Sequence, residues 1–382
     1  MKINSNRLQW VVLGAISIGL FGLLKWQSWQ RPQTLPVPMP VGTGMELAVT
    51  RDGRYLVQSG TYPGSVFDLH TAKLHVEQFA SHGSATRILP DSRTIVQIGY
   101  SDIVNGLYTS ISLGDVTKLT HFRTFAREQV ANKALACSPT TSEIATFNSQ
   151  GELCFWDSKN GSLLRKWPGF QGKWPKDRLK AFIKQPPKNW KAAVGPPPNT
   201  LEFSPSGTVL AVGDWTALDY VVSEPGTTSD VALWDVASGR KIRDLPLPHG
   251  LKLIGPNTRD WSYVHCKNLV FSPDEKMLAT DSRGQGVLIW DVKSGAVRHI
   301  LHHLNTTGEP QKPNGAGVTF SPDSRLLAAA GDFGTVDVWE VSSGKLLRQY
   351  RASGPAVFLP DGSRLITGGE NLRGNLMSWP VP

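Results

Sequence analysis

The stretch LVFSPDEKMLATDSRGQGVLIWDVKSGAVRH, residues 269–299, decides the fold. It contains two strand–turn–strand phrases, LVFSPDEKMLAT (269–280) and VLIWDVKSGAVRH (287–299). In each phrase two apolar runs are separated by a short polar turn with Pro, Asp, Ser or Gly. Apolar runs bounded by such turn residues indicate short antiparallel strands. The stretch therefore predicts four consecutive strands.

The same pair of phrases recurs along most of the chain. Clear copies of the first phrase stand at 201–212, 318–329 and 356–367, and weaker ones at 47–58, 87–98 and 135–146. Copies of the second phrase stand at 153–165, 231–243 and 336–348, with a weaker one at 65–77. From the turn proline to the tryptophan the spacing is constant in three units: 139 to 156, 273 to 290 and 322 to 339. Seven units of four strands predict an all-β, seven-bladed β-propeller, because one unit cannot bury both of its faces alone.

These phrases resemble those of the WD40 repeat in its divergent prokaryotic form. The characteristic Trp-Asp or Trp-Glu dipeptide stands at 156–157, 234–235, 290–291 and 339–340. The resemblance covers about residues 44–382 and implies the propeller fold, which hosts many functions. The family's Gly-His dipeptide is missing, so we do not expect its Asp–His–Ser/Thr–Trp hydrogen-bond network.

The last unit ends at its third strand, NLMSWPV (375–381), with no residues left for a fourth. We expect the N-terminal segment TLPVPMPV (34–41) to supply that strand and close the ring. Pro36, Pro38 and Pro40 alternate, so their missing N–H groups would face one side, which an edge strand tolerates. The alternative is a polyproline linker.

The N-terminus carries an uncharged run at 8–24, LQWVVLGAISIGLFGLL, which is just long enough to cross a bilayer as a helix. We predict a short tail at 1–7, a transmembrane anchor at 8–24, a linker at 25–33 and the propeller at 34–382. A cleaved signal peptide is the alternative, but no small-residue cleavage site follows the run. Both interpretations place the propeller outside the cytoplasm. With the anchor, it is a periplasmic or cell-surface domain of a single-pass membrane protein.

The cysteines, the histidines and the absence of catalytic motifs exclude several classes of site. Cys137 and Cys154 fall on the first and third strands of one blade, about 10 Å apart, too far for a disulfide. Five histidines and Cys266 lie between 249 and 303, without a recognised zinc spacing. No nucleophile elbow or phosphate loop occurs. We therefore predict no catalytic residue, no metal and no cofactor.

The long connections all fall on one face of the predicted ring, its top. They are the second-to-third loop of blade four and the segments 168–199, 246–267 and 303–316 between blades. Residues 165–199 contain nine basic residues and one acid, a net +8 of the chain's +9. Basic residues interleaved with aromatics suit an acidic protein surface or an anionic polymer. The predicted partner-binding residues are Trp174, Lys176, Arg178, Lys180, Lys184, Lys188, Trp190 and Lys191.

The same insertion also has a purely structural interpretation, in which Trp167, Trp174 and Trp190 pack on the blade and the lysines are solvated. Our leading hypothesis is a membrane-anchored, monomeric, non-catalytic scaffold that binds a protein or an anionic polymer through its top face. One alternative is a propeller enzyme with a site in the central channel, although the spacing shows no convergent carboxylates there. Another is a cytoplasm-facing scaffold with an acidic or nucleic-acid partner, which an exported propeller would not meet.

Overall fold

The computed structural model of the chain describes residues 32–35, 46–59, 64–79, 83–100, 109–118, 123–125, 130–148, 152–168, 200–213, 229–246, 266–282, 286–304, 310–311, 313–331, 334–352, 354–368 and 376–382. Within these ranges the regular elements are all β-strands. The prediction of an all-β fold is confirmed for this part of the chain.

Seven antiparallel sheets of four strands form the fold, and we number them blades one to seven. Blades one to three contain β2 (Glu46–Val49), β3 (Tyr55–Ser59), β4 (Gly64–Asp68) and β5 (Lys73–Phe79); β6 (Gly83–Ile88), β7 (Thr94–Tyr100), β8 (Thr109–Asp115) and β9 (Arg123–Phe125); and β10 (Val130–Cys137), β11 (Glu143–Asn148), β12 (Leu153–Asp157) and β13 (Leu163–Trp167). Each blade is a simple meander, as the repeated phrases predict.

Blades four to seven follow the same order. They contain β14 (Thr200–Phe203), β15 (Val209–Gly213), β16 (Ser229–Asp235) and β17 (Lys241–Pro246); β18 (Cys266–Phe271), β19 (Met277–Ser282), β20 (Gly286–Asp291) and β21 (Val297–Leu301); β24 (Pro313–Phe320), β25 (Leu326–Gly331), β26 (Thr335–Glu340) and β27 (Leu346–Arg351); and β28 (Ala356–Phe358), β29 (Arg364–Thr367), β30 (Leu376–Pro380) and β1 (Gln33–Leu35). A hairpin of β22 (His303–Leu304) and β23 (Pro310–Gln311) stands between blades five and six.

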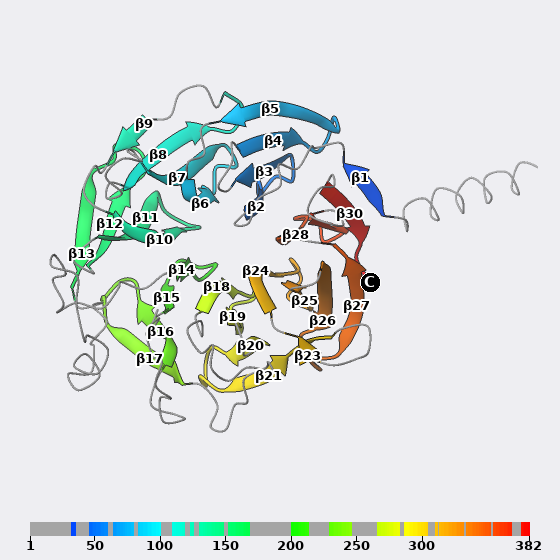
Figure 1. Cartoon of the computed structure of the whole chain (residues 1–382). Coiled ribbons are helices and arrows are strands. Elements are labelled where there is room, and N and C mark those ends of the chain that lie inside the picture. The colour runs from blue at the N-terminus through cyan, green and yellow to red at the C-terminus, as the bar shows by residue number, and fades with distance from the viewer. Residues whose placement is uncertain are drawn as a thin grey trace, which may run out of the picture.

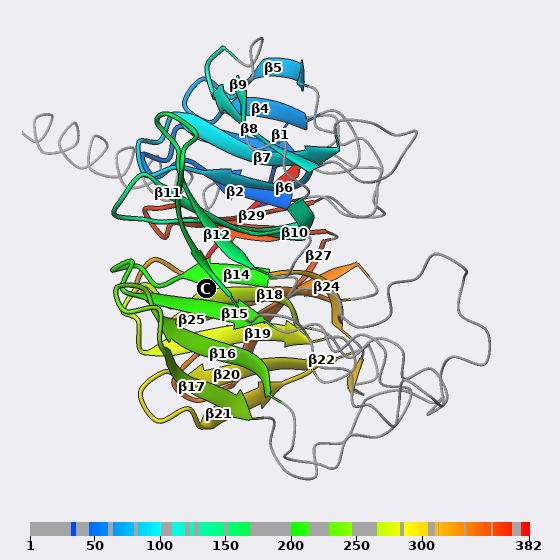
Figure 2. The same cartoon turned by 90° about the vertical axis from the view of Figure 1, so that its left-hand side faces the viewer.

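The blades form a ring in which the first strand of each blade lies nearest the axis and the fourth forms the circumference (Figure 1). From the side, the strands run between the two faces of the ring (Figure 2). We call the bottom the face that carries the turns from first to second and from third to fourth strand. The top carries all other connections, because successive strands of a meander reverse direction.

The ring closes through the N-terminal strand, as predicted. β1 pairs antiparallel with β30, so that Gln33 lies opposite Ser378 and Leu35 opposite Leu376. The strand begins one residue before the predicted segment 34–41, and residues 36–45 lie outside the described residues. Since β30 runs from top to bottom and β1 runs the other way, the chain enters the ring from the bottom face.

Glycines in the bottom turns allow neighbouring blades to approach one another. Gly207 and Gly239 both have positive φ, +73° and +67°. A Cβ on Gly207 would lie 2.5 Å from Thr140 Oγ1, and one on Gly239 would lie 3.0 Å from Trp167 Nε1, each in the preceding blade. Only glycine combines this left-handed conformation with so close a contact.

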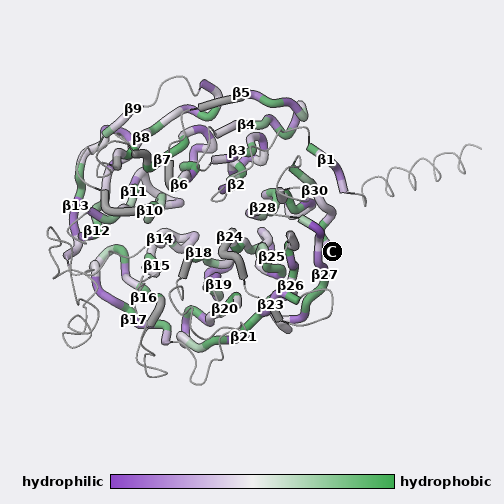
Figure 3. The backbone as a smooth tube through the Cα atoms, viewed as in Figure 1, coloured by the Kyte–Doolittle hydropathy of each residue, from purple (hydrophilic) through white to green (hydrophobic). Residues whose placement is uncertain are grey.

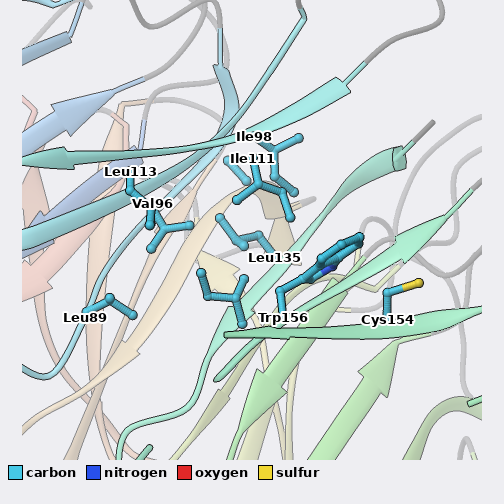
Figure 4. Packing of buried hydrophobic residues seen from close by; sticks show 10 residues of the cluster. Leu89, Val96, Ile98, Ile111, Leu113, Leu135, Cys154 and Trp156 are labelled. Carbon is cyan, nitrogen blue, oxygen red and sulfur yellow. The ribbon is translucent and has the colours of Figure 1, made fainter. Parts of the chain in front are cut away.

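The hydrophobic core lies between the blades rather than within one of them. Hydrophobic residues recur along the strands of every blade (Figure 3). Between blades two and three, Ile98 and Ile111 pack with Leu135 and Trp156, each at most 5% exposed (Figure 4). Because each layer draws on two blades, the core is complete only when the ring is closed.

One link of the WD40-type hydrogen-bond network, the bond between tryptophan and threonine, is present, so the expectation that the network is absent is wrong in part. In three blades the tryptophan of the third strand donates its indole N–H to a threonine of the second strand: Trp156 to Thr146 at 3.0 Å, Trp290 to Thr280 at 3.2 Å and Trp379 to Thr367 at 2.8 Å. This bond joins adjacent strands of one sheet, and it therefore does not depend on the missing Gly-His dipeptide.

No helix that is long and apolar enough to cross a membrane occurs among the residues that the structure describes. The predicted tail at 1–7 and anchor at 8–24 lie outside those residues. Of the predicted linker at 25–33, the described part is residues 32 and 33, and Gln33 already belongs to β1.

Candidate functional site

Four connections leave the top edge of blades three to six. They run from β13 to β14, from β15 to β16, from β17 to β18 and from β21 to β24. The corresponding bottom turns are short, and one of them spans only the residues between Phe203 and Val209. This asymmetry is the one that the sequence predicts, and it makes the top of blades three to six the elaborated face.

The eight predicted partner-binding residues, Trp174, Lys176, Arg178, Lys180, Lys184, Lys188, Trp190 and Lys191, all lie outside the described residues. The structure places only the two ends of their insertion, Trp167 at the end of β13 and Thr200 at the start of β14. Their joint action on a partner therefore stays a prediction.

Trp167 itself is a packing residue, as the structural interpretation of the insertion expects. Its ring lies 4.5 Å from that of Phe155 and 6.4 Å from that of Trp234, in the next blade. Arg165 lies over the Phe155 ring and forms a bidentate ion pair with Glu143, at 2.6 and 2.9 Å. The insertion therefore starts from a rigid base at the junction of blades three and four.

A second rigid element supports the top between blades five and six. His303 and Asp337 have no exposed surface, and His303 Nδ1 lies 2.9 Å from Asp337 Oδ2. The imidazole also packs edge-to-face on Trp339, with ring centroids 5.2 Å apart. His303 is thus part of the core, although the sequence places it in a connection between blades.

The axis of the ring carries a polar group that sequence spacing did not reveal. Arg87 donates from Nη1 to Glu46 Oε2 at 3.2 Å and to the Thr86 carbonyl at 2.8 Å. The Thr86 N–H donates to the same Glu46 oxygen at 2.9 Å. We call Glu46, Arg87, Cys137 and Glu202 the axial cluster, because all four stand on innermost strands and interact through space.

Burial and neighbouring charges shift the pKa values of three members of the axial cluster. Burial raises the pKa of Glu202 to about 7, and the Arg87 cation only partly offsets this. Burial likewise raises the pKa of the Cys137 thiol to about 12. Burial lowers the pKa of Arg87, but Glu46 and Glu202 outweigh it and raise that pKa overall. Glu202 therefore changes charge near neutral pH, while Cys137 stays a thiol and Arg87 a cation.

The sequence did contain a signal for this cluster. Arg87 and Glu202 occupy the second residue of the first phrase, in TRILP and LEFSP, where other units have small or apolar residues such as Ala48, Ala136 and Val270. A charge at that position of an innermost strand points towards the axis or the next blade. Glu46 and Glu202 both interact with Arg87, an arrangement that the spacing of carboxylates in the sequence does not show.

The sequence analysis also made predictions about cysteine residues and metal ligands. Cys137 and Cys154 are free thiols on β10 and β12, separated by β11, as predicted. Cys154 is buried and Cys137 half-buried. Among the residues described, no group of three or more His, Cys, Asp or Glu side chains is arranged to hold a metal ion.

Comparison with known proteins agrees with this architecture. No family model matches the chain. Over 105 residues the chain is 30% identical to the WD repeat-containing protein VIP3 of Arabidopsis thaliana. That match covers 28% of this chain and 29% of the plant protein, less than a third of either. Together with the seven blades, it supports describing the chain as a WD40-like propeller, a fold that generally binds protein partners.

Proposed function

We propose that this WD40-like propeller is a non-catalytic interaction scaffold, held at a membrane by residues 8–24 and binding a protein or anionic polymer on its top face around blades three to five. The observation that carries the proposal is the placement of the long connections, all of which leave one face of a rigid ring. Binding residues concentrate in loops that such a scaffold positions.

The entry of the chain supports the same orientation. β1 reaches the ring from the bottom, so a membrane segment before it would hold the bottom towards the bilayer. The top would then face away from the membrane, where a partner can reach it. The strands that flank the basic insertion at 168–199 end and begin at this outward face, and the net charge of the insertion favours an acidic partner surface or an anionic polymer.

Capture of partners from membrane extracts tests the scaffold. We would compare the full chain with a variant in which the eight predicted residues are replaced by Gln or, for tryptophan, Ala. Loss of one specific captured species is the expected result. A matched control replaces Lys159, Arg240 and Lys293, which are exposed in bottom turns, and should retain that species. Identical capture by all three proteins would contradict binding through the insertion.

Reporter fusions at Pro382 test the location. A reporter active only outside the cytoplasm is expected to work there, and one active only inside is expected to fail. The opposite pattern would contradict the exported scaffold. It would favour a cytoplasm-facing scaffold, with an acidic or nucleic-acid partner for the basic insertion.

The axial cluster favours a second candidate function, a ligand-binding or catalytic site on the axis. A carboxyl group whose pKa is raised in the fold costs stability when it ionises, and such costs are typical of functional sites. Because the pKa of Glu202 rises to about 7 from a usual value near 4, this cost grows as pH rises from 4 to 7.

We therefore expect Glu202→Gln to stabilise the protein by about 1–3 kcal/mol at pH 8 and to have little effect at pH 4. Urea unfolding at the two pH values measures this. Arg87→Gln serves as a contrast, since it removes the partner of Glu46 and should destabilise at both. If Glu202→Gln does not raise the free energy of unfolding at pH 8, ionisation of Glu202 does not destabilise the fold, and the second candidate function loses its support.

A further inference from the structure

The outer strands of four neighbouring blades carry exposed cations, but they use them differently. On β13, β17 and β21 a cation is paired with a carboxylate of the same blade: Arg165 with Glu143 at 2.6 Å, Lys241 with Asp244 at 2.9 Å and Arg298 with Asp291 at 2.8 Å. These pairs hold the outer strand or its turn and leave little charge for another molecule.

Blade six is different. Lys345, Arg348 and Arg351 lie on β27 or in the turn before it, and all three are exposed. Within the part of the chain that the structure describes, none of them forms an ion pair. The acid in the same turn, Glu340, is bound by the Ser343 hydroxyl at 2.5 Å. Between these cations Leu347 leaves 39% of its surface exposed.

The unpaired cations of β27 lie beside the strand that carries the N-terminal segment. On β27, Tyr350 donates its hydroxyl to the Pro380 carbonyl at 2.6 Å and packs its ring 4.7 Å from that of Trp379, on β30. The strand beyond β30 is β1. Arg348 is two residues before Tyr350 and interacts with it electrostatically, so it belongs to the same side of β27 as Tyr350, which faces β30.

We propose that the outer strand of blade six docks on anionic lipid headgroups next to the point where the N-terminal segment enters the bilayer. This proposal rests on the proposed membrane attachment. With its bottom still towards the bilayer, the ring then tilts towards the rim formed by blades six and seven, so that Arg348 and Lys345 reach phosphates and Leu347 reaches the interface. Arginine and lysine suit this position because their apolar stems can lie along the surface while their charges meet the headgroups.

The tether length agrees with this arrangement. About ten linker residues between the apolar run and β1 span at most roughly 35 Å, which keeps the rim of blade seven near the bilayer. The sequence of that linker contains two further basic residues, Lys25 and Arg31. An anionic surface of the bilayer is therefore the partner that charge and position together favour.

Hydrogen exchange on the full chain in lipid nanodiscs tests the docking. We would compare nanodiscs of phosphatidylcholine alone with nanodiscs that also contain phosphatidylglycerol. β27 is an edge strand, so its unpaired amides exchange fast unless something covers them. We expect residues 346–351 to exchange more slowly only when phosphatidylglycerol is present, and this protection to fall as salt is added.

The triple variant K345E/R348E/R351E should abolish the protection. Each basic residue near an anionic surface strengthens its binding roughly fivefold, so even neutralising three lowers the docked population roughly a hundredfold. The control K159E/R240E/K293E changes charge equally on blades three to five, outside the rim of blades six and seven that the tilt brings to the bilayer, and should keep it. Protection of β27 in both lipids, in neither, or in the triple variant would overturn the docking proposal.

A separate experiment tests membrane attachment itself: an anchored chain should stay with the nanodiscs after an alkaline wash. If it does not stay, the anchor is wrong, and docking is then decided by flotation of the chain with vesicles. Flotation with vesicles that contain phosphatidylglycerol, lost in the blade-six variant and kept in the control, supports docking without an anchor. The absence of such flotation overturns it.

Discussion

Blades five and six are built from the same two phrases, yet they accommodate their buried tryptophan in different ways. In blade five the Trp290 indole donates to the Thr280 hydroxyl. At the corresponding position blade six has Ala329, and the Trp339 ring packs instead against His303. Both tryptophans are at most 2% exposed.

The comparison shows that the partner of the buried tryptophan can come from inside the repeated phrases or from a connection between blades. Thr280 belongs to the repeated phrase itself, two residues after the strand partner of Trp290. His303 belongs to the connection between blades, and it is held by Asp337 on the third strand of blade six. Blade six therefore depends on its neighbour for packing around its tryptophan, whereas blade five contains its own hydrogen-bond acceptor.

The largest expected effect follows from the His303–Asp337 pair. Asp337→Ala leaves a fully buried imidazole without its partner, and we expect a loss of about 3 kcal/mol in the free energy of unfolding. Asp337→Asn retains an oxygen acceptor and should lose about 1 kcal/mol. Urea unfolding measures both. Equal losses for the two variants would mean that the hydrogen bond to His303 does not support blade six.

The next effect concerns blade five. Thr280→Val keeps the shape of the side chain but removes the acceptor of the Trp290 indole, which should cost about 1–2 kcal/mol. Thr319→Val in blade six provides the control, since Thr319 is only partly buried and has no indole partner in the described structure. Equal losses in the free energy of unfolding for the two variants would contradict a stabilising role of the Trp290–Thr280 hydrogen bond.

The turn of blade five contains a carboxylate that makes its stability depend on pH. Hydrogen bonds from Arg298 and from the Ser294 N–H and hydroxyl lower the pKa of Asp291 to about 2. Because the unfolded chain has a value near 4, this carboxylate stabilises the fold above pH 4 and loses that contribution as pH falls to 2.

We expect Asp291→Asn to lose about 1 kcal/mol at pH 7, after allowing for solvent screening in a surface turn. The difference from the native chain should shrink as pH falls from 4 towards 2. Glu340→Gln in the matching turn of blade six is the control, and unfolding curves at several pH values are the measurement. A loss that is independent of pH would show that the Asp291 charge is not responsible.

The smallest effect concerns the outer strands. Arg298→Ala removes the ion pair with Asp291 and should cost about 0.5 kcal/mol. Arg348→Ala removes a cation without such a pair and should leave stability unchanged within about 0.3 kcal/mol. Thermal unfolding of the two variants in detergent solution distinguishes these effects. A larger loss for Arg348→Ala would assign that residue a structural role and weaken its assignment to lipid.

Much of the fold could be predicted because its signals are local. The polar turn of SPDE, the glycine of KSG and the apolar runs around them each act over a few residues, so they mark strands wherever they occur. The spacing from Pro273 to Trp290 repeats along the chain, and repetition turns local strands into blades. Even the closing strand followed from a count of strands in the last unit.

The candidate site could be predicted only in part. The side of the ring that carries long connections follows from connection lengths, which are a property of the sequence. The charges of Arg87 and Glu202 stand out within the repeated phrase, but the interaction of Glu46, Arg87 and Glu202 does not follow from it, because the three residues come from three blades. Residues separated by a whole blade have no local pattern that relates them.

By itself the sequence determined the strands, the number of blades and the face that carries the insertions, because these depend on neighbours along the chain. Only the tertiary structure decided that His303 is buried against Trp339, that Arg87 interacts with two carboxylates and that β27 lies next to β30. Each of these contacts joins different blades. Closure of the ring brings those blades together, and the strength of each contact depends on the burial that closure creates.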